Sequence, residues 1–114
     1  MELKVIEESE SLSYVALKGR LDLEGVMGIE TKFLQHTTSR RKPALVDMSG
    51  VEFMASLGIR MLLSCAKALH SHQAKLVLLR PQQLVAEVLD SMGLEDILLV
   101  TNDEAEAREL LRRS

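Results

Sequence analysis

The stretch of residues 47–58 constrains the fold of this chain most, because it joins an apolar strand to an apolar helix through a few polar residues. Residues 44–46 before it are typical of a short central strand, and residues 57–69 after it are apolar on almost every side. The sequence therefore predicts a strand, a turn and a helix start in direct succession. Binding sites of α/β proteins gather at the carboxyl ends of their strands, so we expect the functional surface here.

Ser56 lies at the start of the helix that this stretch predicts. Serine is common as a helix N-cap, and this is the simpler interpretation of the residue. The unpaired N–H groups of a helix N-terminus also stabilise an anion, such as a phosphate attached to this serine. An esterase nucleophile is excluded, because a nucleophile elbow requires glycine two residues before the serine, where this chain has Met54.

Five segments rich in apolar and β-branched residues are spaced as strands: residues 3–7, 13–18, 44–48, 75–79 and 97–100. The first two form a β-hairpin, and Gly19 is expected to end the second. Helical segments separate the later strands. We therefore predict a single α/β domain over residues 1–114, with a mostly parallel five-stranded sheet, an N-terminal β-hairpin and about four helices.

Each predicted helix has an apolar face. The first helix follows Asp22 as its N-cap, and its expected buried face consists of Leu23, Val26, Met27, Ile29, Phe33 and Leu34. The third begins at Pro81 and ends at Gly93, and its expected buried face consists of Leu84, Val85, Val88, Leu89 and Met92. Residues 101–104 fit a capping box for the last helix. Apolar surface near Leu57 and Met61 is expected to stay exposed as a docking patch.

Composition and charge exclude several functions. A net charge of −3 gives no long-range attraction for nucleic acid, and with 3% aromatic residues the chain cannot build base-stacking platforms. The basic run of residues 40–42 is interpreted as a solvated loop. No apolar run approaches the roughly 18 residues of a membrane span, and no signal pattern opens the sequence. Cys65 is the only cysteine and is expected to be a buried thiol. We therefore expect a cytoplasmic protein.

No catalytic or metal-binding constellation is recognisable. The two histidines of residues 70–72 lie at a helix end without nearby cysteine or acidic ligands, so they are interpreted as part of a solvated turn. Glycine-rich phosphate loops and dinucleotide fingerprints are absent from the sequence. Nothing supplies a base positioned against a nucleophile. We expect no cofactor, no metal and no enzymatic activity.

Three segments, residues 19–22, 47–58 and 88–94, resemble the STAS domain family, the anti-sigma factor antagonists. The central one has the pattern Asp47-x-Ser49-x-Val51-x-Phe53-Met54-x-Ser56-x-Gly58. The resemblance implies that Ser56 is phosphorylated by a partner kinase. It also implies that Asp22 and Asp47 lie close to the phosphorylation loop, although each is also commonplace as a helix cap or at a strand end. Two positions depart from the family's pattern, which typically has Asp in place of Ala55 and Ser or Thr in place of Leu57.

The resemblance implies a monomeric regulatory protein that binds a serine-kinase anti-sigma factor. Phosphorylation of Ser56 would release the partner, and a phosphatase would reset the switch. The expected partner-binding residues are Asp22, Asp47, Met54, Ala55, Ser56, Leu57, Gly58 and Met61. The alternative is a STAS subunit that is not phosphorylated and stabilises an ATPase of a lipid-transport complex. Ala55 and Leu57 favour this alternative, whereas Ser56 and Gly58 favour the first function.

Overall fold

The computed structural model describes residues 1–94 and 97–113, and its elements alternate as the sequence predicts. In chain order they are β1 (Glu2–Glu8), β2 (Ser13–Leu21), α1 (Leu23–His36), the 3₁₀ turn η1 (Thr38–Arg40), β3 (Ala44–Met54), α2 (Ser56–His70), β4 (Leu76–Leu79), α3 (Gln83–Ser91), β5 (Leu99–Thr101) and α4 (Glu104–Arg112). The strands form one sheet in the order β1-β2-β3-β4-β5. Only β1 and β2 pair antiparallel within it. The predicted α/β architecture is confirmed.

The two central strands are longer than the sequence predicts. Strand β3 does not turn after Met48 but continues to Met54, and β2 passes through Gly19 to Leu21. The predicted ends of both strands are therefore wrong. The two strands pair along this whole length, with irregularities in the register that include the step after Gly19. Gly50 allows the close pairing, because a Cβ atom there would lie 2.9 Å from the Leu17 carbonyl oxygen.

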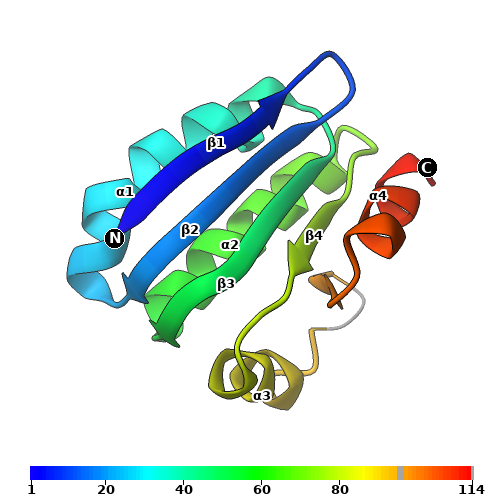
Figure 1. Ribbon diagram of the computed structural model, residues 1–114. Coiled ribbons are helices and arrows are strands. Elements are labelled where there is room, and N and C mark those ends of the chain that lie inside the picture. The colour runs from blue at the N-terminus through cyan, green and yellow to red at the C-terminus, as the bar shows by residue number, and fades with distance from the viewer. Residues whose placement is uncertain (95–96, 114) are drawn as a thin grey trace.

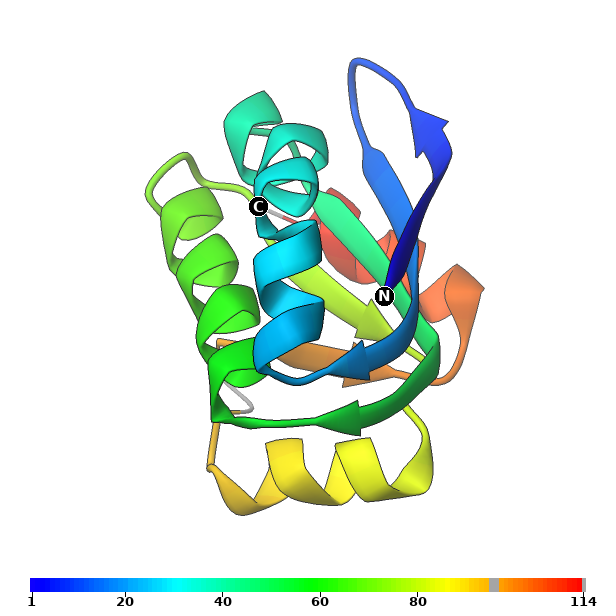
Figure 2. The ribbon, with the colours of Figure 1, turned by 90° about the vertical axis from the view of Figure 1, so that its left-hand side faces the viewer.

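The helices cover the sheet unequally, as Figures 1 and 2 show. Helices α1 and α2 pack on one face over the larger core cluster, which includes the fully buried Phe33, Val46 and Leu62. Helix α4 packs on the other face over a smaller cluster that includes Tyr14 and Leu45. Helix α3 lies across the end of the sheet at which β3 and β4 finish.

Helix α1 contacts the core through a narrower stripe than predicted. Val26, Ile29 and Phe33 are buried, but Leu23 is 60% exposed and Met27 is 74% exposed. The prediction that these two residues are buried is wrong, because they lie one turn apart beside the stripe and not within it. On α3 the same correction applies to Leu84 and Met92, which are 71% and 53% exposed.

Candidate functional site

The starts of α1 and α2 lie side by side at one edge of the sheet. Leu21 and Met54 are paired in the register of β2 and β3, and each strand leads within two residues into its helix. The Ala55 N–H donates to the Leu21 carbonyl over 3.0 Å. Gly58 presses against the same residue, since a Cβ atom there would lie 2.9 Å from the Leu21 Cβ atom. Asp22 and Ser56 therefore share one edge of the molecule, at the carboxyl ends of two parallel strands.

Helix α2 begins without a capping side chain. Ala55 occupies the N-cap position in an extended conformation, and Ser56 is the first helical residue and is exposed. The interpretation of Ser56 as the N-cap is therefore wrong. The Ala55 carbonyl accepts bonds from the N–H groups of Gly58 and Ile59, over 2.9 and 3.2 Å. No acidic residue lies in the first turn. The positive end of this helix dipole thus has no compensating charge within that turn.

Helix α1 begins in the opposite way, with a charged cap. The Asp22 carboxylate accepts from the Gly25 N–H over 2.9 Å, which confirms Asp22 as the N-cap. This backbone hydrogen bond is the main reason that the pKa of Asp22 is lowered, and Arg20 contributes to the same shift. The Arg20 guanidinium also lies 4.4 Å above the centre of the Phe53 ring, so it connects the start of α1 to the end of β3.

Exposed apolar side chains lie on the elements that flank Ser56. Leu23 and Met27 come from α1, Phe53 is 41% exposed at the end of β3, and Leu57 is partly exposed on α2. Of these four residues, only Leu57 was predicted to bind a partner. In α1, Leu23 and Met27 lie beside the stripe of Val26, Ile29 and Phe33 and not within it, and this offset was the signal that could have found them.

Two predicted surface residues belong to the core instead. Met54 is 6% exposed and Met61 is 2% exposed, and both join the larger cluster under α1 and α2. Met61 faces inward because it is in line with Leu62, Cys65 and Leu69 along the buried side of α2. The prediction of an exposed patch at Met61 is therefore wrong. Gly58 is also buried, and it contributes close packing and not a contact surface.

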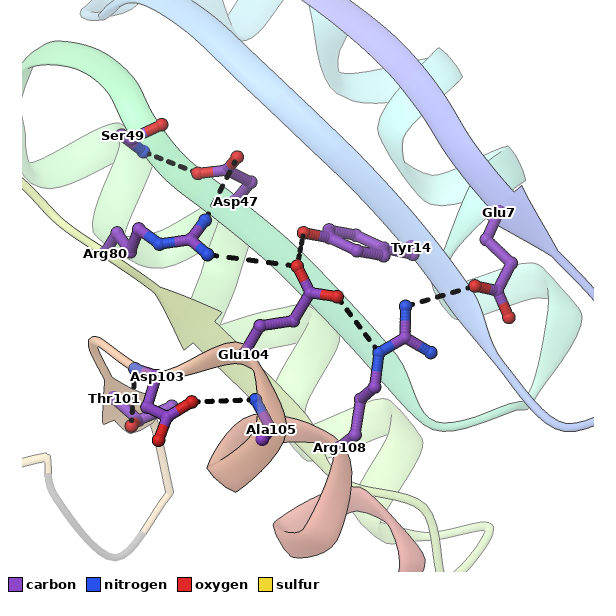
Figure 3. Close-up of polar contacts among 10 residues, drawn as sticks. All are labelled: Glu7, Tyr14, Asp47, Ser49, Arg80, Thr101, Asp103, Glu104, Ala105 and Arg108. Carbon is purple, nitrogen blue, oxygen red and sulfur yellow. Dashed lines mark hydrogen bonds and ion pairs between the residues drawn. The ribbon is translucent and has the colours of Figure 1, made fainter.

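Asp47 lies on the other face of the sheet, as Figure 3 shows. Its carboxylate accepts from the Ser49 N–H over 2.9 Å and lies 4.0 Å from an Arg80 nitrogen. It lies two positions after Leu45 and therefore on the same face of β3, the face over which α4 packs, whereas Val46 between them faces the larger cluster. The structure therefore separates Asp47 from Asp22 and Ser56, contrary to the implied cluster, because successive positions of a strand alternate between the two faces.

The neighbours of Asp47 form an ion-pair network that holds α4 in place (Figure 3). Glu104 accepts from the Tyr14 hydroxyl over 3.1 Å and pairs with Arg108 over 3.2 Å, and Arg108 reaches Glu7 of β1 over 3.2 Å. Burial, followed by the Glu104 carboxylate, raises the pKa of the Tyr14 hydroxyl. This network was not predicted from the sequence, because its members come from separate elements. Its contacts attach α4 to β1 and β2.

Two further features bear on possible functions. Within residues 1–94 and 97–113, no group of three His, Cys, Asp or Glu side chains could hold a metal ion. Over the same part of the chain, no helix has both the length and the apolar character needed to cross a bilayer.

Residues 6–101 match the family model described as "Mlab, STAS domain". This match spans most of the chain, and the chain belongs to the STAS domain family. No curated protein sequence matches it closely enough to be a relative.

Several solved structures are similar to this chain. An anti-sigma factor antagonist from Mycobacterium paratuberculosis has a TM-score of 0.81 at 18% identity, covering 97% of this chain and 95% of its own. The antagonist SpoIIAA of Bacillus is similar in its unphosphorylated form, with a TM-score of 0.75 at 21% identity over 97% and 96% of the two chains. Its phosphorylated form has a TM-score of 0.67 at 19% identity over 96% and 99%. The murine anion transporter Slc26a9 matches over 95% of this chain but only 19% of its own, with a TM-score of 0.72 at 16% identity. At these identities the likeness shows the shared fold.

Proposed function

We propose that this chain is an anti-sigma factor antagonist of the partner-switching type. In this proposal it captures a serine-kinase anti-sigma factor in the cytoplasm, and phosphorylation of Ser56 releases the partner until a phosphatase resets it. The observation that carries the proposal is the position of Ser56, exposed as the first residue of an uncapped helix. SpoIIAA, which has the same fold, occurs in unphosphorylated and phosphorylated forms. That pair of forms supports the proposed switch.

The start of α2 is suited to hold a phosphate without changing the fold. A phosphate on Ser56 adds about −1.5 to −2 charges, which the unpaired N–H groups and the helix dipole stabilise. Arg60 lies four residues further along α2 and is exposed, and it has no carboxylate partner among the described residues. Residues at this spacing are neighbours on a helix surface, so the guanidinium can approach the phosphate.

The surrounding surface explains how the phosphate would release a partner. Leu23, Met27, Phe53 and Leu57 offer apolar area that a partner protein can cover. A hydrated dianion among them would have to be desolvated on binding, which is costly without a matching cation on the partner. Leu57 is apolar where the family has a hydroxyl, and burying such a side chain contributes about 1.5 to 3 kcal/mol. Ala55 removes a carboxylate that would repel the phosphate.

Phosphorylation by the cognate kinase tests the switch. We expect mass spectrometry to find one phosphate, on Ser56, and to find none in Ser56→Ala. Ser49 and Ser64 are also exposed and serve as internal controls. Phosphate that appears chiefly on either of them, or that persists undiminished in Ser56→Ala, would show that the modification site is misassigned.

Calorimetry with the purified partner tests the docking surface. Leu57→Ser, Leu23→Ser and Ser56→Asp should each weaken binding at least tenfold, which corresponds to about 1.4 kcal/mol. Val100→Ser is the matched control, because Val100 is 42% exposed on β5, three strands from β2. Unchanged binding in all three variants would mean that the partner docks elsewhere.

The second candidate function is a STAS subunit that is not phosphorylated and stabilises the ATPase of a lipid-transport complex. Ala55 and Leu57 favour it, because they replace polar residues of the antagonists' pattern beside the serine. The matched family model is described as "Mlab, STAS domain" and names no sigma factor. A pull-down from native cell extract with wild-type and Ser56→Asp baits separates the two functions. An ATPase held equally by both baits supports the second, and a kinase lost from the Ser56→Asp bait supports the first.

A further inference from the structure

Five cations lie at the end of the molecule opposite Ser56, three of them exposed (Arg41, Arg112 and Arg113) and two partly exposed (Lys42 and Lys75). We call this the basic end and define it by Arg41, Lys42, Lys75, Arg112 and Arg113. The Ala44 N–H donates to the Lys75 carbonyl over 2.9 Å, so the turns that lead into β3 and β4 are adjacent. Pro43, next to Lys42, lines a surface hollow together with Arg112. Figure 1 shows both turns and the end of α4 at the same end of the sheet.

The charges of the basic end are poorly neutralised within the chain. Arg41, Lys42 and Lys75 pair with no carboxylate in the part that the structure describes. Arg112 and Arg113 share the single carboxylate of Glu109, over 3.7 and 3.9 Å. The hairpin nearby carries Glu7, which is paired with Arg108, Glu8, which is paired with His36, and the exposed Glu10. Among the described residues the five cations outnumber Glu10 and Glu109, so a chain whose net charge is −3 keeps a local excess of positive charge here.

Charges of both signs lie near Ser56: Arg20 is paired with Asp22, and Glu24, Glu52 and Arg60 are exposed. The longest dimension of the molecule is 31 Å, whereas the Debye length at physiological ionic strength is about 8 Å. A charged surface in contact with the basic end is thus screened from the carboxylates at the other end. The net charge of the whole chain does not decide what this end binds.

We propose that the basic end docks reversibly on an anionic bilayer surface, that is, on acidic phospholipid headgroups. Its cations come from three separate segments at one end of the sheet, an arrangement that suits diffuse negative charge. Single-stranded nucleic acid is a less suitable polyanion, because its recognition uses stacking aromatic residues, and Tyr14 and Phe33 are buried while Phe53 lies at the other end. Within the described residues, these segments expose no large apolar side chain, so the attachment is electrostatic and salt-sensitive.

This orientation points the Ser56 surface away from the bilayer. Attachment to the membrane and capture of a protein partner are then compatible in one molecule. The proposal does not depend on the phosphorylation of Ser56, because the two surfaces lie at opposite ends of the sheet.

Sedimentation of the full chain with vesicles tests the proposal. Vesicles of phosphatidylcholine with about 40% phosphatidylglycerol should bind at least tenfold more tightly than pure phosphatidylcholine, and about 0.5 M salt should release the protein. Arg41→Glu/Lys42→Glu should lose at least tenfold in affinity. Lys4→Glu/Lys18→Glu is the matched control, with the same change of net charge on β1 and β2, and should stay within about twofold of wild type. Ser56→Asp should bind the vesicles as wild type does.

Three outcomes would overturn the proposal. Equal binding to neutral and anionic vesicles would exclude an electrostatic attachment. Equal losses in both double variants would show that net charge matters and the basic end does not. Duplex DNA that displaces the protein from vesicles at equal total phosphate would identify nucleic acid as the preferred polyanion. Circular dichroism of each variant checks that it is folded.

Discussion

The starts of α1 and α2 share the same close packing against β2, but they differ in their N-cap residues. In each helix the residue three positions after the N-cap is a glycine pressed against the last residues of β2, Gly25 in α1 and Gly58 in α2. The N-cap itself is Asp22 in α1 but Ala55 in α2. Both helices are thus positioned by close backbone packing. Of the two, α1 alone also has an N–H group of its first turn, that of Gly25, bonded to the side chain of its N-cap residue.

The two N-termini differ in whether the fold itself supplies the anion that a helix N-terminus can bind. At α1 the Asp22 carboxylate takes the place that an external anion would occupy. At α2 that place is open, and an exposed serine stands beside it. Four predictions test this contrast, beginning with the largest expected effect.

Replacing the two closely packed glycines should lower the free energy of unfolding most. In Gly25→Ala the new Cβ atom would lie 1.9 Å from the Arg20 carbonyl oxygen, so the start of α1 must move, and we expect a loss of about 3 kcal/mol or more in urea unfolding. Gly58→Ala should lose about 1 to 3 kcal/mol, because its nearest atoms lie at 2.9 Å.

The control for these variants is Gly28→Ala in α1, where a Cβ atom would meet nothing within 4 Å. Its free energy of unfolding should rise by up to about 1 kcal/mol, because alanine has a higher helix propensity than glycine. A gain in Gly25→Ala as well would mean that the two helix starts are not held by close packing.

Removing the cap of α1 should have the next largest effect. Asp22→Ala should lower the thermal midpoint by about 5 °C, because one N–H of the first turn loses its acceptor. Asp22→Asn retains an acceptor oxygen and should stay close to wild type at neutral pH. Equal losses in both variants would indicate that the carboxylate acts through its charge and not as a cap.

Supplying a cap to α2 should stabilise the fold and impair the proposed switch. Ala55→Asn and Ala55→Asp should each raise stability by about 1 kcal/mol, because a side chain now accepts from the first turn. A phosphate on Ser56 would then compete for the same N–H groups, and in Ala55→Asp it would also be repelled. Kinase assays should therefore show slower phosphorylation in Ala55→Asp than in Ala55→Asn. Rates equal to wild type in both would show that the open N-terminus does not favour phosphorylation.

The smallest expected effect is the pH dependence of the capped helix. The folded-state pKa of Asp22 lies below its ordinary value of 3.8, so its stabilising contribution is complete above that value and is lost as the pH falls through the folded pKa. Any advantage of wild type over Asp22→Asn in thermal unfolding should therefore shrink steadily as the pH falls below 3.8 and through the folded pKa. An advantage that grows on acidification would contradict the assigned direction of the shift. The N-cap of α2 contributes nothing to this pH dependence, since Ala55 has no ionisable side chain.

The architecture and the cap of α1 were predictable, because local signals carry them. Strand and helix segments follow from hydrophobic periodicity, and Asp22 is a favourable cap residue whatever surrounds it. The choice of Ser56 as the modified residue came from the family resemblance and stays a prediction. The ends of β2 and β3 were not predictable, because glycines that normally interrupt a strand are accepted where two strands pair closely.

Tertiary packing alone decided which residues share a surface. The sequence shows Leu23, Met27 and Met61 as equally apolar, and only the docking of the helices on the sheet exposes the first two and buries the third. Likewise Asp22 and Asp47 both follow apolar strand positions, yet the pleat directs Asp47 to the α4 face while Asp22 stays beside Ser56. Periodicity determines the side of an element on which a residue lies. What that side faces depends on neighbours that are distant in the chain.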